Sequence, residues 1–401
     1  MRRVVVGLSL LLSLSPAVRG AEVPMPTERA ALVRGNTKFA LELYARLRTN
    51  EGNLFVSPYS ISSALAMTYA GAHGQTAEEM ARTLHFELPN DKLHPAFAAL
   101  LNEVDGAGDK KRGYQLSTAN ALWGQKGYPF HADFLKRTRE SYDAGLNNVD
   151  FSGATEAARK TINAWVEKET HDRIKDLLQP GILTADTRLV LTNAIHFKGD
   201  WASQFKKDRT REVPFYQTAN KQDVVPMMRQ TATFRYCDGG TFQVLELPYV
   251  GNDLAMVVLL PKKIDGLAAL EKDLSPENLT LWLGKLHKNE VEVHLPRCRM
   301  TAEFKLAKTL GSMGMATAFT DAADFSGIAS KERLHIDDVI HKAFVDINEE
   351  GTEAAASTAV VIKPTAFIEL PVFRADHPFL FLIRDTRSNS ILFLGRFVEP
   401  K

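Results

Sequence analysis

The sequence predicts one large α+β domain, because helical patterns dominate its first half and strand patterns its second half. No linker-like stretch divides the chain, and no two segments form an internal repeat. With 401 residues, 45% of them hydrophobic and 24% charged, the chain has ample material for a buried core. Its formal net charge of +1 argues against a general nucleic-acid or membrane-surface binder.

The N-terminus has the pattern of a cleavable secretory signal. Two arginines precede an apolar stretch over 4–14, and small residues follow up to Gly20. This stretch is well short of the ~20 residues that span a bilayer, and no later segment is long and apolar enough to do so. We therefore expect a signal peptide over 1–20 and a single domain over 21–401, secreted to the extracellular space, or to the periplasm if the source is bacterial.

The helices of the first half are predicted from end signals and helical spacing. Ser57 has the place of an N-cap, Pro58 occupies the first helical position and Gly71 ends the pattern. Thr76 and Glu79 have the spacing of a capping box for the next helix. Further helical patterns cover 31–47, 131–142, 155–169 and 276–286.

The second half is rich in strand patterns. The segment RLVLTNAIHF, residues 188–197, is mostly apolar, as expected of a central strand buried on both faces. FQVLELPYVGNDLAMVVLLP predicts a hairpin that turns at Gly251 and Asn252. EVEVHLP alternates, DVIHKAFVDINEE is a further strand, and PFLFLIRDTRSNSILFLGRFVEP predicts a closing hairpin.

The chain lacks the short motifs of common catalytic and metal sites. It contains no G-x-S-x-G, H-E-x-x-H, P-loop or G-x-G-x-x-G pattern, so we expect no enzyme, no metal and no cofactor. His287 and His294 fit surface and core positions better than a metal site. The only two cysteines, Cys237 and Cys298, could form one bridge in an exported protein, but their strand-like contexts suit buried thiols, and we favour free thiols.

The segment NEEGTEAAASTAVVIKPTAF, residues 348–367, has the alternation of a strand without the bulk of a core. Every even position over 352–362 is uncharged, small at first and β-branched later, whereas the odd positions over 353–363 carry both charges. Gly351 provides a hinge, and Pro364 stops ladder pairing because it has no N–H. Two interpretations remain open: a static strand in an ordinary sheet, or a loop that becomes a strand.

Several blocks of the sequence, in the same order, resemble segments of the serpins, the serine protease inhibitor superfamily. NEEGTEAAASTA resembles the hinge of the serpin reactive centre loop. The other blocks are NLFVSPYSISSALAMTYAGA, LTNAIHFKGDW, VIHKAFVDINEEGTEAA, ADHPFLFLIRD and ILFLGRFVEP. The resemblance covers about Thr37 to Pro400, and it favours the loop that becomes a strand. It implies an α+β serpin fold with three β-sheets, about nine α-helices and an exposed reactive centre loop over about 349–373.

The resemblance also implies a mechanism. A target serine protease, or a cysteine protease, would attack the loop as a substrate and form a covalent acyl-enzyme, and insertion of the freed loop into the main sheet would trap it. Counting seventeen residues from Glu349, as in the family, places the cut between Thr365 and Ala366. Threonine suggests an elastase-like or subtilisin-like target. Lys363, which a proline follows, and Phe367 are the alternative positions.

Further site residues come from the resemblance alone. The loop hinge would comprise Glu349, Glu350, Gly351, Thr352, Glu353, Ala354, Ala355, Ala356 and Ser357. A polar cluster beneath the sheet opening would comprise Ser57, Ser60, Asn193 and His341. Insertion would begin at Trp201, Arg297 and Glu349.

Two features of the chain bear on whether this machinery works. The small hinge residues favour an inhibitor over the alternative, a non-inhibitory serpin that acts as a carrier, chaperone or storage protein. Asp172 departs from the family pattern, which has glycine there, and this puts the local turn in doubt. We expect a monomer whose partner is the target protease, with no nucleic acid and no membrane.

Overall fold

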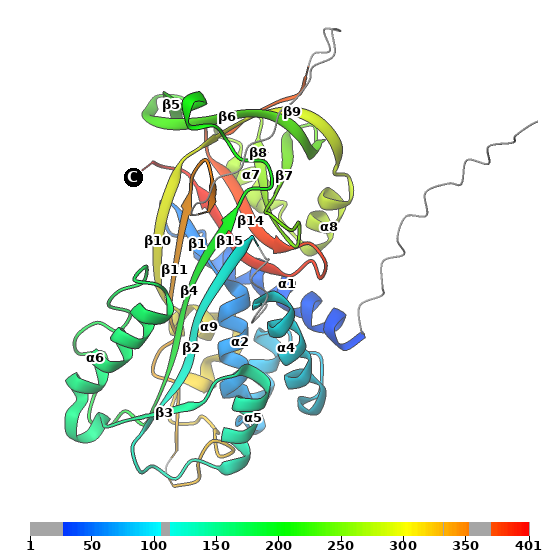
Figure 1. Cartoon of the computed structure of the whole chain (residues 1–401). Helices are drawn as coiled ribbons and strands as arrows, with labels where there is room; N and C mark the ends of the chain where they lie inside the picture. The colour runs from blue at the N-terminus through cyan, green and yellow to red at the C-terminus, as the bar shows by residue number, and fades with distance from the viewer. Residues whose placement is uncertain (1–26, 106–112, 332, 353–369, 401) are drawn as a thin grey trace, which may run out of the picture.

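The computed structural model describes residues 27–105, 113–331, 333–352 and 370–400, and these form nine α-helices and fifteen strands (Figure 1). The helices are α1 (Thr27–Leu47), α2 (Pro58–Tyr69), α3 (Gly74–Thr83), α4 (Asn90–Asp105), α5 (Ala132–Tyr142), α6 (Phe151–Glu169), α7 (Leu267–Lys272), α8 (Pro276–Gly284) and α9 (Ala307–Leu310). Three short helical turns are η1 (Lys207–Arg209), η2 (Gly311–Met315) and η3 (Ala316–Phe319).

The strands form two hydrogen-bonded sheets. The larger has the order β1 (Leu54–Val56), β15 (Ile391–Phe397), β14 (Phe379–Asp385), β8 (Leu254–Pro261), β7 (Phe242–Pro248), β6 (Lys221–Asp238), β9 (His287–Pro296) and β13 (Val372–Arg374), with β5 (Arg211–Thr218) also paired to β6. The smaller has the order β10 (Cys298–Lys305), β11 (Ile340–Ile347), β4 (Leu189–Asp200), β2 (Tyr114–Gln125) and β3 (Leu146–Val149), with β12 (Gly351–Thr352) also paired to β4.

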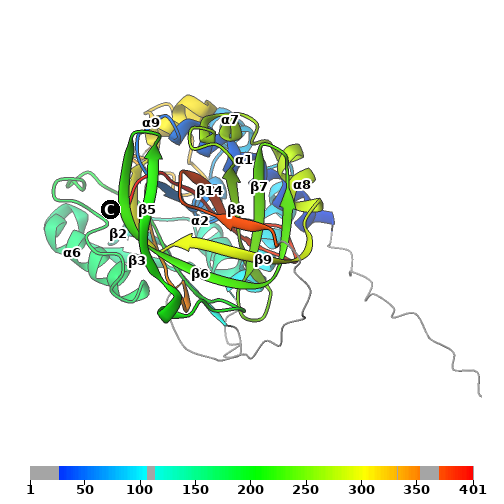
Figure 2. The same cartoon turned by 90° about the horizontal axis from the view of Figure 1, so that it is seen from above.

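The predicted α+β fold is confirmed, and its sheets are joined by one long strand. β6 pairs with β5 at its start, with β9 along its middle and with β7 at its end. Two of the three sheets expected from the resemblance are therefore continuous in hydrogen bonding. Seen from above, β5, β6 and β9 spread across the upper end of the molecule (Figure 2).

The core has two parts, one on each face of the smaller sheet. Helix α2 lies between the two sheets and is buried from Pro58 to Thr68. As predicted, Ser57 caps it and accepts a hydrogen bond from the Ser60 N–H at 3.2 Å. On the other face, α6 packs its apolar side, including Phe151 and Ile162, against the sheet.

Most predicted elements are present, but the capping box is wrong. The hairpin β7–β8 turns through Gly251 and Asn252, both with positive φ, as expected. Helix α3 begins two residues before Thr76, and its N-cap, His73, makes no side-chain bond. Thr76 and Glu79 instead bind a segment that is distant in sequence.

Contacts with residues distant in sequence account for Thr76 and Glu79, which do not cap helix α3. The Thr76 hydroxyl accepts from the Asp324 N–H at 2.9 Å, and the Glu79 carboxylate accepts from the Thr317 N–H at 2.9 Å. Sequence spacing alone does not distinguish such long-range bonds from a capping box.

The two cysteines, Cys237 and Cys298, are buried and free, as favoured from the sequence. Among the described helices, none is long and apolar enough to cross a membrane. The predicted signal over 1–20 lies outside the described residues.

Candidate functional site

Strands β4 and β11 run parallel at the centre of the smaller sheet, yet they pair over only a short length. The pairs run from Thr192 with Ile340 to His196 with Phe344. Above this stretch β4 pairs with β12, and below it a cavity opens. Figure 1 shows β4 and β11 side by side, and the described residues of the predicted hinge, polar cluster and insertion start lie on these strands or next to their ends.

At the upper end, Trp201 fixes the chain that leaves β11. Its indole N–H donates to the Asn348 carbonyl and its backbone N–H to the Glu350 carbonyl, both at 3.0 Å. The ring stacks on Tyr249, with centroids 4.7 Å apart and planes 12° apart. Trp201 therefore holds the backbone of residues 348–350, where the predicted hinge begins.

Arg297 and Glu349 form an ion pair beside this tryptophan, as the resemblance implied. Arg297 Nε donates to the two carboxylate oxygens at 2.9 and 2.8 Å, and Nη2 adds a bond of 2.5 Å. The Thr210 hydroxyl donates as well. The Glu349 side chain is 1% exposed and that of Arg297 is 41% exposed, so only the acid is fully removed from water.

Opposing effects act on the Glu349 carboxyl. Burial alone would raise its pKa, but the hydrogen bonds from Arg297 and Thr210 outweigh burial, and the pKa is lowered below its ordinary value. The group is therefore a carboxylate at neutral pH, and it is bound by Arg297, the residue that precedes β10.

Two residues of the predicted hinge already belong to the sheet. Gly351 pairs with Asp200 and Thr352 with Gly199, antiparallel to β4. Thr352 is fully buried, and its hydroxyl lies 3.1 Å from that of Tyr249. A Cβ at position 351 would collide with the Gly199 carbonyl oxygen, so glycine is required there by close approach.

The four residues of the predicted polar cluster lie in contact at mid-height. The Ser57 N–H donates to His341 Nε2 at 3.0 Å, and His341 Nδ1 bonds to the Asn193 side-chain oxygen. The Asn193 amide donates to the Ser60 hydroxyl at 2.7 Å. The network thus ties β4 and β11 to each other and to α2.

Burial lowers the pKa of His341 to about 3. The ring is therefore neutral. It accepts at Nε2 from Ser57 and donates from Nδ1 to Asn193, so the hydrogen bonds assign its tautomer.

Sequence reasoning missed two members of the network, Asn120 and Ser63. The Asn193 amide also donates to Asn120 Oδ1 at 2.7 Å, and the Asn120 amide donates to the Ser63 hydroxyl at 3.1 Å. Asn120 lies directly opposite Asn193 on β2. Its signal was an asparagine inside an otherwise small and apolar run, in a stretch for which no strand was predicted.

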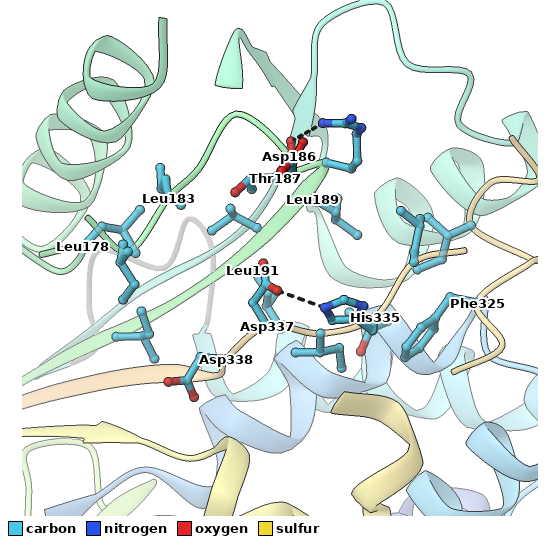
Figure 3. A pocket seen from close by; sticks show the side chains of 18 of the residues that line it. Leu178, Leu183, Asp186, Thr187, Leu189, Leu191, Phe325, His335, Asp337 and Asp338 are labelled. Atoms are coloured by element: carbon cyan, nitrogen blue, oxygen red, sulfur yellow. Dashed lines mark hydrogen bonds and ion pairs between the residues drawn. The ribbon is translucent and has the colours of Figure 1, made fainter. Parts of the chain in front are cut away.

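A cavity of about 150 Å³ lies at the foot of the two strands (Figure 3). Leu189 and Leu191 of β4 form one wall, and Phe325 lies on the opposite side. His335 and Asp337 also line it, with His335 Nε2 3.1 Å from the carboxylate of Asp337. Over 189–191, the edge of β4 that faces the cavity has no pairing strand among the described residues.

Other predictions about the site have mixed outcomes. The bond Thr365–Ala366 and the hinge residues from Glu353 to Ser357 lie outside the described residues. Asp172 takes a left-handed φ of 60°, so it retains the backbone conformation that the usual glycine favours. The described residues contain no cluster of acidic, histidine or cysteine side chains suited to a metal.

The family model described as Serpin (serine protease inhibitor) matches residues 34–400. The chain is a serpin. Human Serpin B4 is 41% identical over 394 residues, which covers 92% of this chain and 100% of that protein. The leukocyte elastase inhibitor of Xenopus tropicalis is 43% identical, covering 91% of this serpin and 98% of that protein. A solved structure of a cleaved, loop-inserted ovalbumin mutant is 33% identical, with a TM-score of 0.83 and coverage of 92% and 100%.

Proposed function

We propose that this serpin is a suicide-substrate inhibitor of serine proteases, or of cysteine proteases, that traps its target by inserting the cleaved loop between β4 and β11. The observation that carries the proposal is the pairing of Gly351 and Thr352 with β4 at the top of these strands. Two further findings support it: similar proteins are named leukocyte elastase inhibitors, and a similar ovalbumin mutant is loop-inserted after cleavage.

The two existing pairs suggest a register for the proposed insertion. Thr352 lies opposite Gly199, and in an antiparallel pair each later residue of the loop lies opposite the preceding residue of β4. Val360 would therefore lie opposite Leu191, and Ile362 opposite Leu189. These two leucines line the foot cavity. The β-branched end of the loop would therefore fill the part of the cavity that Leu189 and Leu191 line, beside the unpaired edge of β4.

The same register places the small residues of the loop. Thr352 is fully buried against Tyr249 of the main core, and the even positions of an inserted strand would share its face. Ala354 and Ala356 would then lie opposite Phe197 and Ile195, which belong to the main core. Small side chains are what that packed face can accept.

Thr358 would lie opposite Asn193 in this register. Insertion separates Asn193 from His341, because the new strand enters between β4 and β11. The Thr358 hydroxyl could then donate to the Asn193 side-chain oxygen, which loses His341, and accept from His341 Nδ1. The polar cluster would thus keep its hydrogen bonds in both states, which avoids the cost of an unsatisfied buried group.

Sheet energetics favour the inserted state. A short parallel pairing of β4 and β11 would be replaced by two antiparallel ladders. At about 0.5–1.5 kcal/mol for each ladder bond, and about 1.5–3 kcal/mol for burying each of Val360 and Ile362, the gain is on the order of 10 kcal/mol. The fourteen residues from Thr352 to Thr365 would carry an attached enzyme roughly 46 Å at ~3.3 Å per residue.

The proposed reaction begins as ordinary acyl transfer. The serine oxygen of the protease bonds to the carbonyl carbon of Thr365, the bond to Ala366 breaks, and the Ala366 amine leaves with the proton. Water would complete hydrolysis, but insertion comes first. Threonine at this position suits a protease with a small primary pocket, of elastase or subtilisin type.

Incubation with elastase-, subtilisin-, chymotrypsin- and trypsin-type proteases tests the proposal. We expect a complex that survives boiling in detergent, a released peptide that begins at Ala366, and a nicked protein with a strongly raised Tm. A peptide beginning at Pro364 or Ile368 would move the cut. Loop cleavage without complex and with an unaltered Tm would favour the non-inhibitory alternative.

We also propose that the protein is exported, because the first twenty residues match a secretory signal. N-terminal sequencing of the protein from culture medium or periplasm should give a start after Gly20. An uncleaved N-terminus in the cell interior would contradict export.

A further inference from the structure

Four arginines line one cavity next to β5, β6 and β9. These strands lie at the upper end of the molecule (Figure 2). The cavity holds about 290 Å³, and we call it the arginine cavity. Its cationic residues, from four different elements, are Arg209, Arg211, Arg229 and Arg374. The other lining residues are Val213, Met227, Glu292 and His294.

The strand register aligns part of this charge in a row. Arg229 on β6 lies opposite His294 on β9, and Arg374 on β13 lies opposite the same histidine from the other side. Directly opposite residues share a face, so Arg229 and Arg374 flank His294 on the same face of the sheet. With Arg209 and Arg211 on the same cavity, this face carries more positive than negative charge and suits a negatively charged ligand.

A single carboxylate, that of Glu292, lines the cavity, and it is already hydrogen-bonded to two other lining residues. Glu292 accepts from Arg229 Nε and Nη2 at 3.1 and 2.9 Å. It also lies 2.8 Å from His294 Nε2, which must carry its proton toward the acid. That nitrogen therefore cannot accept from Arg374, whose Nη2 is 3.4 Å away.

The remaining guanidinium groups lack an acidic partner. Arg211 donates only to the backbone carbonyls of Asp208 and Thr210. Among the described residues, no carboxylate lies within ion-pair distance of Arg209, Arg211 or Arg374. Guanidinium forks bind carboxylates with paired hydrogen bonds, and Val213 and Met227 add apolar lining to the same cavity.

We propose that the arginine cavity is a docking site for an acidic surface patch of the target protease. This inference rests on the proposed inhibitory function. Arg374 follows the proposed cut at Ala366 by only eight residues, which is at most roughly 28 Å of extended chain, so a protease bound to the loop would come close to this part of the sheet. Val372, on the same face and 44% exposed, adds an apolar contact. Unpaired positive charge next to the loop would speed encounter with an acidic partner.

The test compares two doubly substituted full-length proteins with equal changes in charge. Arg209→Glu with Arg211→Glu alters the cavity, and Lys160→Glu with Lys308→Glu, at exposed sites on α6 and α9, is the control. Association rate constants and stoichiometry are measured with two proteases of the same primary specificity, one with an acidic and one with a basic surface. Arg211→Gln serves as a milder variant if the double change impairs folding.

For the acidic protease we expect the cavity variant to associate about 10-fold or more slowly, with unchanged stoichiometry, and the difference to shrink at high salt. The control should match the parent. Equal losses in both variants, or no loss in either, would overturn the docking site while leaving inhibition intact.

Two further outcomes separate the alternatives. If protease rates are unchanged but retention on a heparin column is lost only in the cavity variant, the ligand is a sulfated polysaccharide and the protease site is wrong. If the unmodified protein forms no complex with any protease, the inhibitory function fails, and the docking proposal fails with it.

Discussion

The hydroxyl of Thr352 lies 3.1 Å from the hydroxyl of Tyr249, inside the protein, although Thr352 is the last described residue before the loop. The contact holds Thr352 in the sheet, at the point where the proposed insertion would begin. Tyr249 is itself stacked on Trp201, so packing fixes the partner of Thr352. The following predictions depend on this arrangement.

Thr352→Arg should convert the inhibitor into a substrate. An arginine at this fully buried position would put an unpaired charge in the core, at a cost of several kcal/mol, so insertion would stall and hydrolysis would finish first. Stoichiometry of inhibition on gels measures the effect. Thr218→Arg, at the exposed end of β5, is the control and should inhibit normally. Unchanged stoichiometry in the Thr352 variant would rule out hinge insertion.

The insertion register can be tested with engineered thiols. Directly opposite residues of antiparallel strands lie within disulfide range. After cleavage and mild oxidation, Leu191→Cys with Val360→Cys should form a bond that mass spectrometry detects. Leu191→Cys with Val361→Cys is offset by one residue and should not. Linkage of the offset pair would show that the register is shifted.

Arg297→Gln should lower the free energy of unfolding by about 1–3 kcal/mol, since it leaves the buried Glu349 carboxylate with fewer charged hydrogen bonds. Urea denaturation measures the change. Arg299→Gln is a matched neighbour, because its pair with Asp346 is more exposed, and it should cost much less. Equal costs for the two would show that the Glu349 pair has no special role.

The same pair should make stability depend on acid. The folded pKa of Glu349 is lowered, so its contribution is present above the ordinary glutamate value and is lost as pH falls through the lower, folded value. In Arg297→Gln this loss should occur at a higher pH.

His341 should also make the free energy of unfolding depend on pH, but through burial and not through an ion pair. Burial lowers its folded pKa to about 3, so below about pH 6.5 the unfolded chain binds a proton at this histidine and the folded protein does not. Stability should therefore fall as pH drops through this window. Between pH 7.5 and 4.5, His341→Gln should lose about 2–3 kcal/mol less than the parent. His287→Gln, at an exposed site, should behave like the parent.

Asp172→Gly should leave the protein equally stable or raise its Tm by a few degrees. Asp172 has φ near 60°, a conformation that costs most residues about 1–2 kcal/mol and glycine almost nothing. Asp172→Ala should be destabilising, because alanine lacks both glycine's freedom and the local bonding of aspartate. Stabilisation by alanine would contradict the strain argument.

Sequence patterns identified the elements whose signals are local. The cap at Ser57, the turn at Gly251 and the closing hairpin were all predicted, because each depends on a few adjacent residues. The alternation predicted for the hinge segment stays a prediction, because of its positions only Thr352 lies among the described residues. The resemblance then brought together polar residues from three distant blocks.

Elements that depend on distant partners were missed. No strand was predicted over Tyr114–Gln125, although β2 holds Asn120 of the polar network, because its mixed small and polar residues are decided by the neighbouring β4. Thr76 and Glu79 have the spacing of a capping box in the sequence, but in the structure they bind a loop that is distant along the chain. The row of arginines is invisible from the sequence, since β6, β9 and β13 meet only through register.

The order of the larger sheet has a consequence for biosynthesis. β14 and β15 come last among the described strands and lie between β1 and β8. While a ribosome still holds these two strands, the gap between β1 and β8 stays open and the hydrophobic interior is incomplete. A chain that is cut before Ile391 therefore cannot close the centre of this sheet.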